Sequence, residues 1–192
     1  MDSTIFNEVK IGKQVWMAEN LNVATFCNGD PIPKAITADE WKKAGKNKQP
    51  AWCYYDNDPK NGENYGKLYN WYAVNDPRGL APKGWHLPTY DEWTVLNDFL
   101  GGEEKAGTKM KSKTNWYKEG NGTNESGFNA LPGGIRPNDG TFIYIGIGGT
   151  WWSSTQCTKS TAWEHGLNSI DGQVKRDLTY KDYGLSIRCL RD

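Results

Sequence analysis

The run from Gly84 to Trp93, which reads Gly-Trp-His-Leu-Pro-Thr-Tyr-Asp-Glu-Trp, constrains the fold most because it carries every signal of a helix start. The hydroxyl of Thr89 can accept a hydrogen bond from the first turn, and Glu92, three residues later, can complete a capping box. Apolar residues then recur at helical spacing as far as Leu100, where Gly101 follows as a stop signal. The sequence therefore predicts a helix in mid-chain that begins just after Thr89.

Two segments rich in tryptophan and glycine predict strands in the second half of the chain. Residues 151–155 read Trp-Trp-Ser-Ser-Thr, and residues 184–192 read Gly-Leu-Ser-Ile-Arg-Cys-Leu-Arg-Asp. Aromatic and β-branched residues beside turn-forming glycines are typical of strands. A capped helix followed by such strands predicts an α+β domain whose last strands close a sheet.

Weaker patterns predict the remaining elements and part of the core. We expect Trp85, Trp93, Trp151 and Trp152 to be buried, since large aromatic side chains dominate core packing. The other predicted segments are strands at 4–6 and 9–17, helices at 36–45 and 65–75, a long surface excursion at 101–127, and hairpin turns at 138–140 and 170–172.

Composition limits the classes of partner. The 192 residues are enough for one domain over 1–192, and the 23 basic and 23 acidic residues cancel. We therefore expect no nucleic-acid partner, and no apolar run approaches the ~20 residues of a transmembrane segment. Ten Trp, ten Tyr and 22 Gly suit an exported, loop-rich domain. The start, Met1-Asp-Ser-Thr, has no signal-peptide features. We expect a mature form whose signal or lipoprotein anchor has been removed, with an intracellular protein as the alternative.

The order of several blocks resembles a known family. The blocks G-W-H-L-P-T-x-x-E-W, W-W-S-S-T and G-x-S-I-R-C-x-R-D follow two others, Gln14-Val-Trp-Met-Ala-Glu-Asn-Leu21 and Tyr65-Gly-Lys-Leu-Tyr-Asn-Trp-Tyr-Ala73. Together they resemble the Fibrobacter succinogenes major paralogous domain family over about residues 11–192. The resemblance implies a C-type-lectin-like fold, with two main helices packed on short twisted antiparallel sheets and many loops. It is similar to the fold of formylglycine-generating enzymes and of the variable proteins of diversity-generating retroelements.

The resemblance also bears on location and activity. Domains of this family lie mostly in surface lipoproteins and secreted proteins of Bacteroidetes and relatives, and the family has no general assigned activity. We therefore expect an extracellular or cell-surface location for this chain.

The four cysteines leave two readings open. No C-x-x-C spacing occurs, and only His86 and His165 could join the cysteines as soft-metal ligands, which argues against zinc. Two disulfides would allow three connectivities. Because lectin-like domains often link their closing strands, the resemblance favours a disulfide between Cys157 and Cys189. Buried free thiols are the alternative.

One oxygen-rich segment suggests calcium. Five carboxylate and amide side chains fall within nine residues, together with a glycine that permits a sharp turn, and hard cations bind such oxygen clusters. The alternative is a solvated turn leading into a helix. No cofactor is required, and calcium is a hypothesis for Asp56, Asp58, Asn61, Glu63 and Asn64.

Enzymatic chemistry is not indicated. Formylglycine-generating enzymes need two neighbouring cysteines near the C-terminus, whereas Cys157 and Cys189 are far apart in sequence. Catalytic motifs such as G-x-S-x-G and H-E-x-x-H are absent, and so are the calcium-binding triplets of true C-type lectins. His86 is interpreted as a hydrogen-bonded structural residue. We expect a protein that is not an enzyme, with an oxidase of the formylglycine-generating type as a remote alternative.

The segment from 153 to 183 predicts the ligand surface. It mixes aromatic and small polar side chains, the chemistry of adaptable recognition surfaces, and in the retroelement relatives this C-terminal portion carries the ligand surface. Trp163 and Tyr183 could instead belong to the core. The predicted contacts are Gln156, Thr158, Lys159, Trp163, His165, Asn168, Tyr180, Lys181 and Tyr183.

Together these patterns predict a cell-surface or secreted recognition module. It would bind a glycan or a protein through its C-terminal face, since aromatic rings can stack on the apolar face of a sugar. The alternative is a structural or assembly subunit of a surface fibre or lipoprotein complex, which an exposed edge strand would favour.

Overall fold

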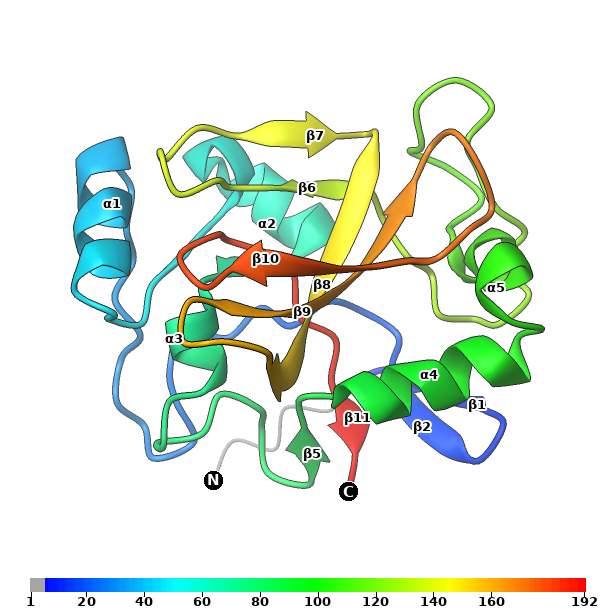
Figure 1. The fold of residues 1–192 in the computed structure, drawn as a ribbon, viewed down its shortest axis with the longest axis horizontal. Helices are drawn as coiled ribbons and strands as arrows, with labels where there is room; N and C mark the ends of the chain where they lie inside the picture. The colour runs from blue at the N-terminus through cyan, green and yellow to red at the C-terminus, as the bar shows by residue number, and fades with distance from the viewer. Residues whose placement is uncertain (1–5) are drawn as a thin grey trace.

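The computed structural model describes residues 6–192 and confirms an α+β architecture (Figure 1). The described part contains five α-helices, one 3-10 helix and three antiparallel or mixed sheets. The helices are α1 (Ala38–Lys46), η1 (Tyr55–Asn57), α2 (Pro59–Tyr65), α3 (Trp71–Val74), α4 (Tyr90–Phe99) and α5 (Glu103–Met110).

The strands form sheets of four, five and two members. The order is β1-β2-β11-β5 in the first, β10-β9-β8-β6-β7 in the second and β3-β4 in the third. The strands are β1 (Glu8–Ile11), β2 (Gln14–Met17), β3 (Trp52–Cys53), β4 (Leu68–Tyr69), β5 (Trp85–His86), β6 (Gly133–Ile135), β7 (Ile143–Ile145), β8 (Gly148–Gln156), β9 (Thr161–Asn168), β10 (Lys175–Tyr180) and β11 (Leu190–Arg191).

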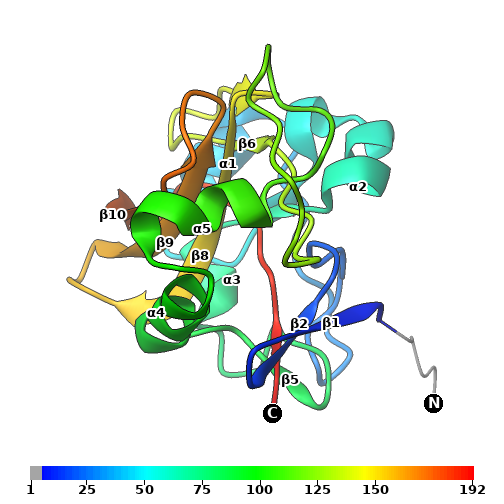
Figure 2. The ribbon, with the colours of Figure 1, turned by 90° about the vertical axis from the view of Figure 1, so that its right-hand side faces the viewer.

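Two predicted helices are confirmed, and both begin with a capping box. Thr89 caps α4 through the backbone N–H of Glu92, whose carboxylate accepts from the Thr89 N–H in return. Thr37 and Glu40 form the same capping box at α1. Both starts were predictable because a capping box depends only on residues three positions apart. Figure 2 shows α4 and α5 side by side in front of β8 and β9.

The five-stranded sheet contains both predicted hairpin turns. Residues 138–140 connect β6 to β7, and residues 170–172 connect β9 to β10, with antiparallel pairing in each case. Along β9, Trp163, His165 and Leu167 lie on one side of the sheet because successive side chains alternate. This side faces α4, since Trp93 stacks on His165. The candidate site lies at its outer margin.

The four-stranded sheet joins both ends of the described chain. The N-terminal hairpin β1–β2 pairs with β11, which also pairs with β5. His86 on β5 lies between two carboxylates: Nδ1 is 2.9 Å from Asp192 and Nε2 is 2.9 Å from Glu92. Burial alone would lower the pKa of His86, but the two hydrogen bonds raise it overall. The hydrogen bonding predicted for His86 is confirmed.

A second polar junction lies in the interior. The Oδ1 atom of Asn20 accepts from the Trp151 indole at 2.8 Å and from two N–H groups of Arg188 at 3.1 and 2.8 Å. The three residues belong to the blocks 14–21, 151–155 and 184–192, which are distant in sequence. The junction therefore fixes the N-terminal hairpin to the large sheet and the C-terminal segment.

Tertiary pairing overrides the helix predicted at 65–75. Gly66 ends α2, and Leu68 and Tyr69 form β4, which pairs with β3. Asn70 then caps the four-residue helix α3. Local periodicity suggested one helix because it contained no information about the partner strand.

Two further predictions need correction. The surface excursion 101–127 contains α5, whose Ala106 and Met110 are buried. The strand predicted over 9–17 is a hairpin, because Gly12 adopts a φ of +61° and reverses the chain. The strand predicted at 4–6 falls largely outside the described residues.

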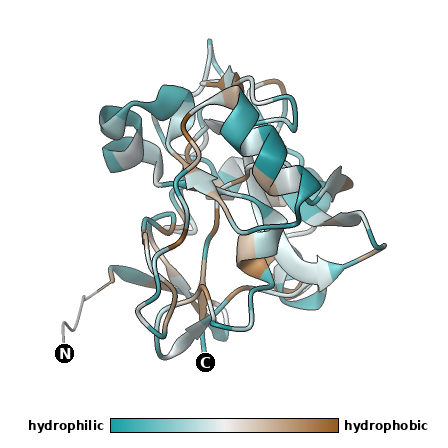
Figure 3. Cartoon of the chain, turned by 90° about the vertical axis from the view of Figure 1, so that its left-hand side faces the viewer, coloured by the Kyte–Doolittle hydropathy of each residue, from teal (hydrophilic) through white to brown (hydrophobic). Residues whose placement is uncertain are grey.

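Tryptophans fill the core as expected, with one exception. Trp93, Trp151 and Trp152 are fully buried, whereas Trp85 is half-buried against Phe6. Hydrophilic residues dominate the surface helices α1 and α2 (Figure 3). Within residues 6–192, no helix has the length and apolar character needed to cross a membrane.

Candidate functional site

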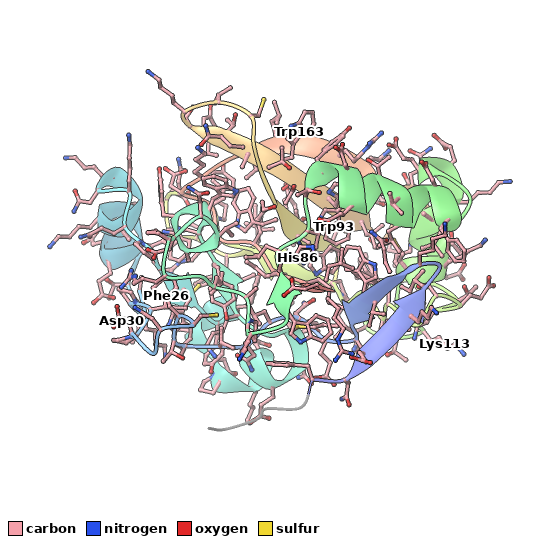
Figure 4. The ribbon with its side chains drawn as sticks, turned by 90° about the horizontal axis from the view of Figure 1, so that it is seen from below. Phe26, Asp30, His86, Trp93, Lys113 and Trp163 are labelled. Carbon is pink, nitrogen blue, oxygen red and sulfur yellow. The ribbon has the colours of Figure 1, made fainter. Side chains whose placement is uncertain are left out.

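A groove of about 490 Å³ lies where the β9–β10 hairpin meets α4 and α5. One wall is aromatic and the other is charged. Figure 4 shows Trp163 beside the start of α4, with Trp93 nearer the centre of the molecule. The lining residues are Tyr90, Glu103, Glu104, Trp163, Gln173, Val174, Lys175, Arg176 and Asp177.

The aromatic wall consists of Tyr90 and Trp163. Their ring centroids are 4.7 Å apart, with the planes inclined at 53°. Tyr90 is fixed by the cap of α4: its N–H donates to Thr155 Oγ1 at 2.9 Å, and its carbonyl accepts from Thr94 Oγ1 at 3.0 Å. Both rings are half-buried. The pair therefore presents a partly exposed apolar surface at the mouth of the groove, and hydrogen bonds fix the position of Tyr90.

The charged wall is organised by Arg176. Its guanidinium forms an ion pair with Glu103, donates to Thr94 Oγ1 at 3.0 Å and lies 4.9 Å from the centre of the Tyr90 ring. Glu104 accepts from Gln173 on the adjoining hairpin. These contacts place both hydrogen-bond donors and acceptors beside the aromatic rings.

His165 lies beneath this surface and does not reach the groove. Its side chain is 2% exposed and stacks on Trp93, with centroids 4.7 Å apart. Burial, with a smaller effect of Arg176, lowers the pKa of His165 to about 3, so the ring is neutral. The prediction that His165 contacts the ligand is therefore wrong in this structure: inward alternation on β9 buries it.

The opposite side of β9 carries a second unusual ionisable group. Glu164 accepts from Thr179 Oγ1 at 3.0 Å and lies opposite Asp177 in the β9–β10 ladder. Burial, together with the charge of Asp177, raises the pKa of Glu164 to about 7. This carboxyl faces away from the groove, because neighbouring residues of a strand point to opposite sides.

Lys181 is also buried, against expectation. It is 4% exposed, lies 4.3 Å above the Trp71 ring, and donates to Gln156 Oε1 at 2.6 Å and to the Lys159 carbonyl at 3.3 Å. The ammonium group holds the β8–β9 turn in place. Lys181 is therefore a structural residue, while Gln156 and Lys159 remain exposed.

The other predicted contacts are dispersed. Thr158 closes the β8–β9 turn by accepting from the N–H of Thr161 at 3.0 Å, and Asn168 accepts from the N–H of Ile170 at 2.7 Å in the next turn. Tyr180 is 56% exposed, and its ring centroid lies 6.1 Å from that of the half-buried Tyr183. Of the nine predicted residues, only Trp163 lines the groove.

The expected disulfide is not formed. All four cysteines are free thiols, with Cys157 exposed on the β8–β9 turn and Cys189 buried in the core. Burial raises the pKa of Cys189, and it raises that of Cys53 to about 11. The two buried thiols agree with the alternative reading; Cys27 and Cys157 are exposed.

The segment proposed for calcium uses its side chains locally. Asp58 caps α2 through the Lys60 N–H at 2.9 Å, Asn61 donates to the Tyr55 carbonyl at 3.0 Å, and Asn64 donates to the Lys60 carbonyl at 3.2 Å. Asp56 and Glu63 are exposed. Among the described residues, no group of three or more acidic, histidine or cysteine side chains is placed to share a metal.

Sequence reasoning missed most of the groove. Tyr90 and Arg176 were not among the predicted contacts, and Glu103 lay in the presumed surface excursion. A signal existed for Tyr90, because it occupies an unspecified position directly after the capping Thr89 and must therefore emerge at the helix start. Glu103 had no comparable signal until the position of α5 was known.

Comparison with known protein families gives a match over nearly the whole chain. The profile described as Fibrobacter succinogenes major domain matches residues 9–191. Neither the curated proteins nor the solved structures yielded a match to the chain.

Proposed function

The chain belongs to the Fibrobacter succinogenes major domain family, and from this premise we propose that it is a non-enzymatic recognition domain that binds a glycan in the β9–β10 groove. The observation that carries the proposal is the Tyr90–Trp163 pair, whose rings meet at 4.7 Å at the mouth of the groove. A pyranose ring presents an apolar face to such a surface. Arg176 and Glu103 would supply hydrogen bonds to its hydroxyl groups.

The ionisable groups support binding rather than catalysis. His165 is buried and neutral beneath the groove, and His86 is engaged on both ring nitrogens by carboxylates. A general base must reach its substrate within hydrogen-bond distance. The groove instead offers Arg176 already paired with Glu103, an arrangement suited to orienting a ligand.

We propose in addition a C-type-lectin-like fold and a cell-surface or secreted location. Closure of the N-terminal hairpin against β11, and packing of α4 on the large sheet, support the fold. The location rests on the family resemblance alone.

A glycan array with matched variants tests the proposal. We expect specific binding by the native domain, equal with calcium or with a chelator, and a loss of about tenfold or more in affinity for Trp163→Ala. Tyr117→Ala is the control, because Tyr117 is equally aromatic, 56% exposed and outside the groove. A blank array, or binding that Trp163→Ala leaves unchanged, contradicts glycan recognition by this groove.

An assembly role is the second candidate, favoured by an apolar tip. Tyr117, Ile147 and Ile170 are exposed on three neighbouring loops, Tyr144 is exposed on β7, and Ile170 is 87% exposed. The loops are tied by the Tyr117 N–H to Gly146 and the Ser169 N–H to Ile147. Sedimentation of the native domain and Ile170→Asp separates the roles: self-association that the aspartate abolishes supports assembly, and a monomer at all concentrations argues against it.

A further inference from the structure

Two neighbouring hollows lie beside the N-terminal hairpin, away from the groove. The outer one measures about 360 Å³ and is bordered by Phe6, Met17 and Val23. The inner one measures about 80 Å³ and contains Arg188 in its wall. Asn20, Asn22 and Glu19 line both, so they form a shared boundary. The pair thus combines an apolar outer chamber with a small polar inner chamber.

Arg188 has one donor left over. The guanidinium carries five N–H groups. Two donate to Asn20 Oδ1, and the two on Nη1 donate to the carbonyls of Met17 and Phe128. The fifth, on Nη2, has no acceptor among residues 6–192. A buried guanidinium with an unused donor beside a hollow is prepared to bind an acceptor.

The charge of Arg188 is also uncompensated at close range. Its side chain is 1% exposed, and its four hydrogen bonds go to three acceptors that all belong to neutral groups. No carboxylate of the described chain comes within ion-pair distance of it. The charge of Glu19 acts on Arg188 without an ion pair, and Glu19 is exposed and accepts from Asn7. Burying a charge without a partner is costly, so an incoming anion would gain strongly here.

The rest of the inner wall consists of asparagine amides, two exposed glutamates (Glu19 and Glu63) and small or apolar residues. Asn129 is half-buried there with a φ of +53°, and its side chain makes no hydrogen bond to the described residues. Asn22 is already committed, since its amide donates to the Gly62 carbonyl at 3.1 Å. Asn129 is therefore the side chain that can join Arg188 in holding a planar anionic group.

We propose that these hollows bind a small organic carboxylate, with its carboxylate group between Arg188 and Asn129 and its body in the outer chamber. A carboxylate matches the guanidinium and the amide because it accepts several hydrogen bonds in one plane. The inner volume holds a group of that size and little more. The site is separate from the groove, so this inference stands or falls independently of glycan recognition.

The test uses acetate as the probe and chloride at equal ionic strength as the reference. We expect acetate to shift the NMR signals of the Asn129 side-chain amide and the Arg188 Nε–H, with a Kd of about 1 mM or weaker. Glucuronate and N-acetylglycine then distinguish a sugar acid from a peptide carboxylate, since the better source should bind more tightly than acetate. Equal shifts with chloride would overturn the proposal, because they would indicate general screening.

The Asn129→Asp variant tests the same site from within. Aspartate tolerates the left-handed backbone of Asn129 and places a carboxylate beside Arg188. We expect a higher Tm and a loss of acetate affinity of more than about tenfold. Asn115→Asp is the matched control, because Asn115 is exposed with a φ of +76° and lies outside both hollows. Retained acetate binding, or an unchanged Tm in Asn129→Asp, would refute the assignment.

Discussion

The junction around Arg188 and the groove around Trp163 are built from similar residues, but the junction is buried and the groove is open. Both combine an arginine, aromatic rings and polar side chains. The Arg188 junction is almost fully buried and joins three distant blocks, whereas the groove is open and lies on one hairpin and two helix starts. The blocks 14–21, 151–155 and 184–192 therefore supply the residues that join the frame of this chain.

The position of Tyr90 sharpens this contrast. It stands at an unspecified position of G-W-H-L-P-T-x-x-E-W, between the capping Thr89 and the Glu92 that completes the cap. The motif thus fixes where the side chain emerges without fixing its identity. Trp163 and Arg176 lie outside all the blocks. Two residues of the groove therefore lie outside the blocks, and a third stands at a position that the motif leaves open.

The largest expected effect comes from breaking the junction. Arg188→Met should lower the free energy of unfolding by about 3 kcal/mol or more, because the acceptors at Asn20, Met17 and Phe128 lose their donors in the interior. Urea denaturation measures the loss. The control is Arg191→Met, which removes only the exposed ion pair with Glu8 and should cost less than about 1 kcal/mol. Equal losses in the two variants would show that the buried junction contributes no more to stability than an exposed ion pair.

A smaller effect on stability is expected at His165, which lies beneath the groove and stacks on Trp93. Burial lowers the pKa of His165 in the folded chain to about 3, below the ordinary value of 6.5. As the pH falls, the unfolded chain therefore binds the proton first. The contribution of neutral His165 to the free energy of unfolding is complete above pH 6.5 and is lost progressively as the pH falls toward 3. His165→Leu should flatten the stability profile in that window, as measured by Tm against pH. A parallel profile for both proteins would contradict the burial of His165.

The smallest expected effect on stability comes from removing either of the two capping boxes, which should differ in their effect on ligand binding. Thr89→Ala and Thr37→Ala should each lower the free energy of unfolding by about 1 kcal/mol, since each removes one capping box. Only Thr89→Ala should also weaken ligand binding, because Tyr90 follows it directly. Chemical denaturation and the glycan assay measure the two outcomes. Equal binding by both variants would mean that the cap does not position Tyr90.

The sequence allowed prediction of those features that depend on near neighbours. The capping boxes at Thr37 and Thr89 and the turns at 138–140 and 170–172 were predictable because their signals lie within a few residues. The helix predicted at 65–75 failed because pairing with Trp52–Cys53 decides the structure there. The local sequence at 65–75 contains no information about such a distant partner strand.

The candidate site was predictable only in part, for a similar reason. Alternation along β9 places Trp163 and His165 on the same side, yet the sequence does not say where α4 covers that side. Trp163 lies at the margin and lines the groove, while His165 lies under Trp93. Burial of Lys181 likewise depends on Trp71, which is distant in sequence.

The pairing of β2 with β11 has a mechanical consequence. A pulling force applied across the two ends would enter the four-stranded sheet first, where the Met17 N–H donates to the Cys189 carbonyl at 3.0 Å. The Arg188 bond to the Met17 carbonyl adjoins the same path. The load would thus be carried by a few bonds near the ends, and the β9–β10 hairpin would remain unstrained until they broke.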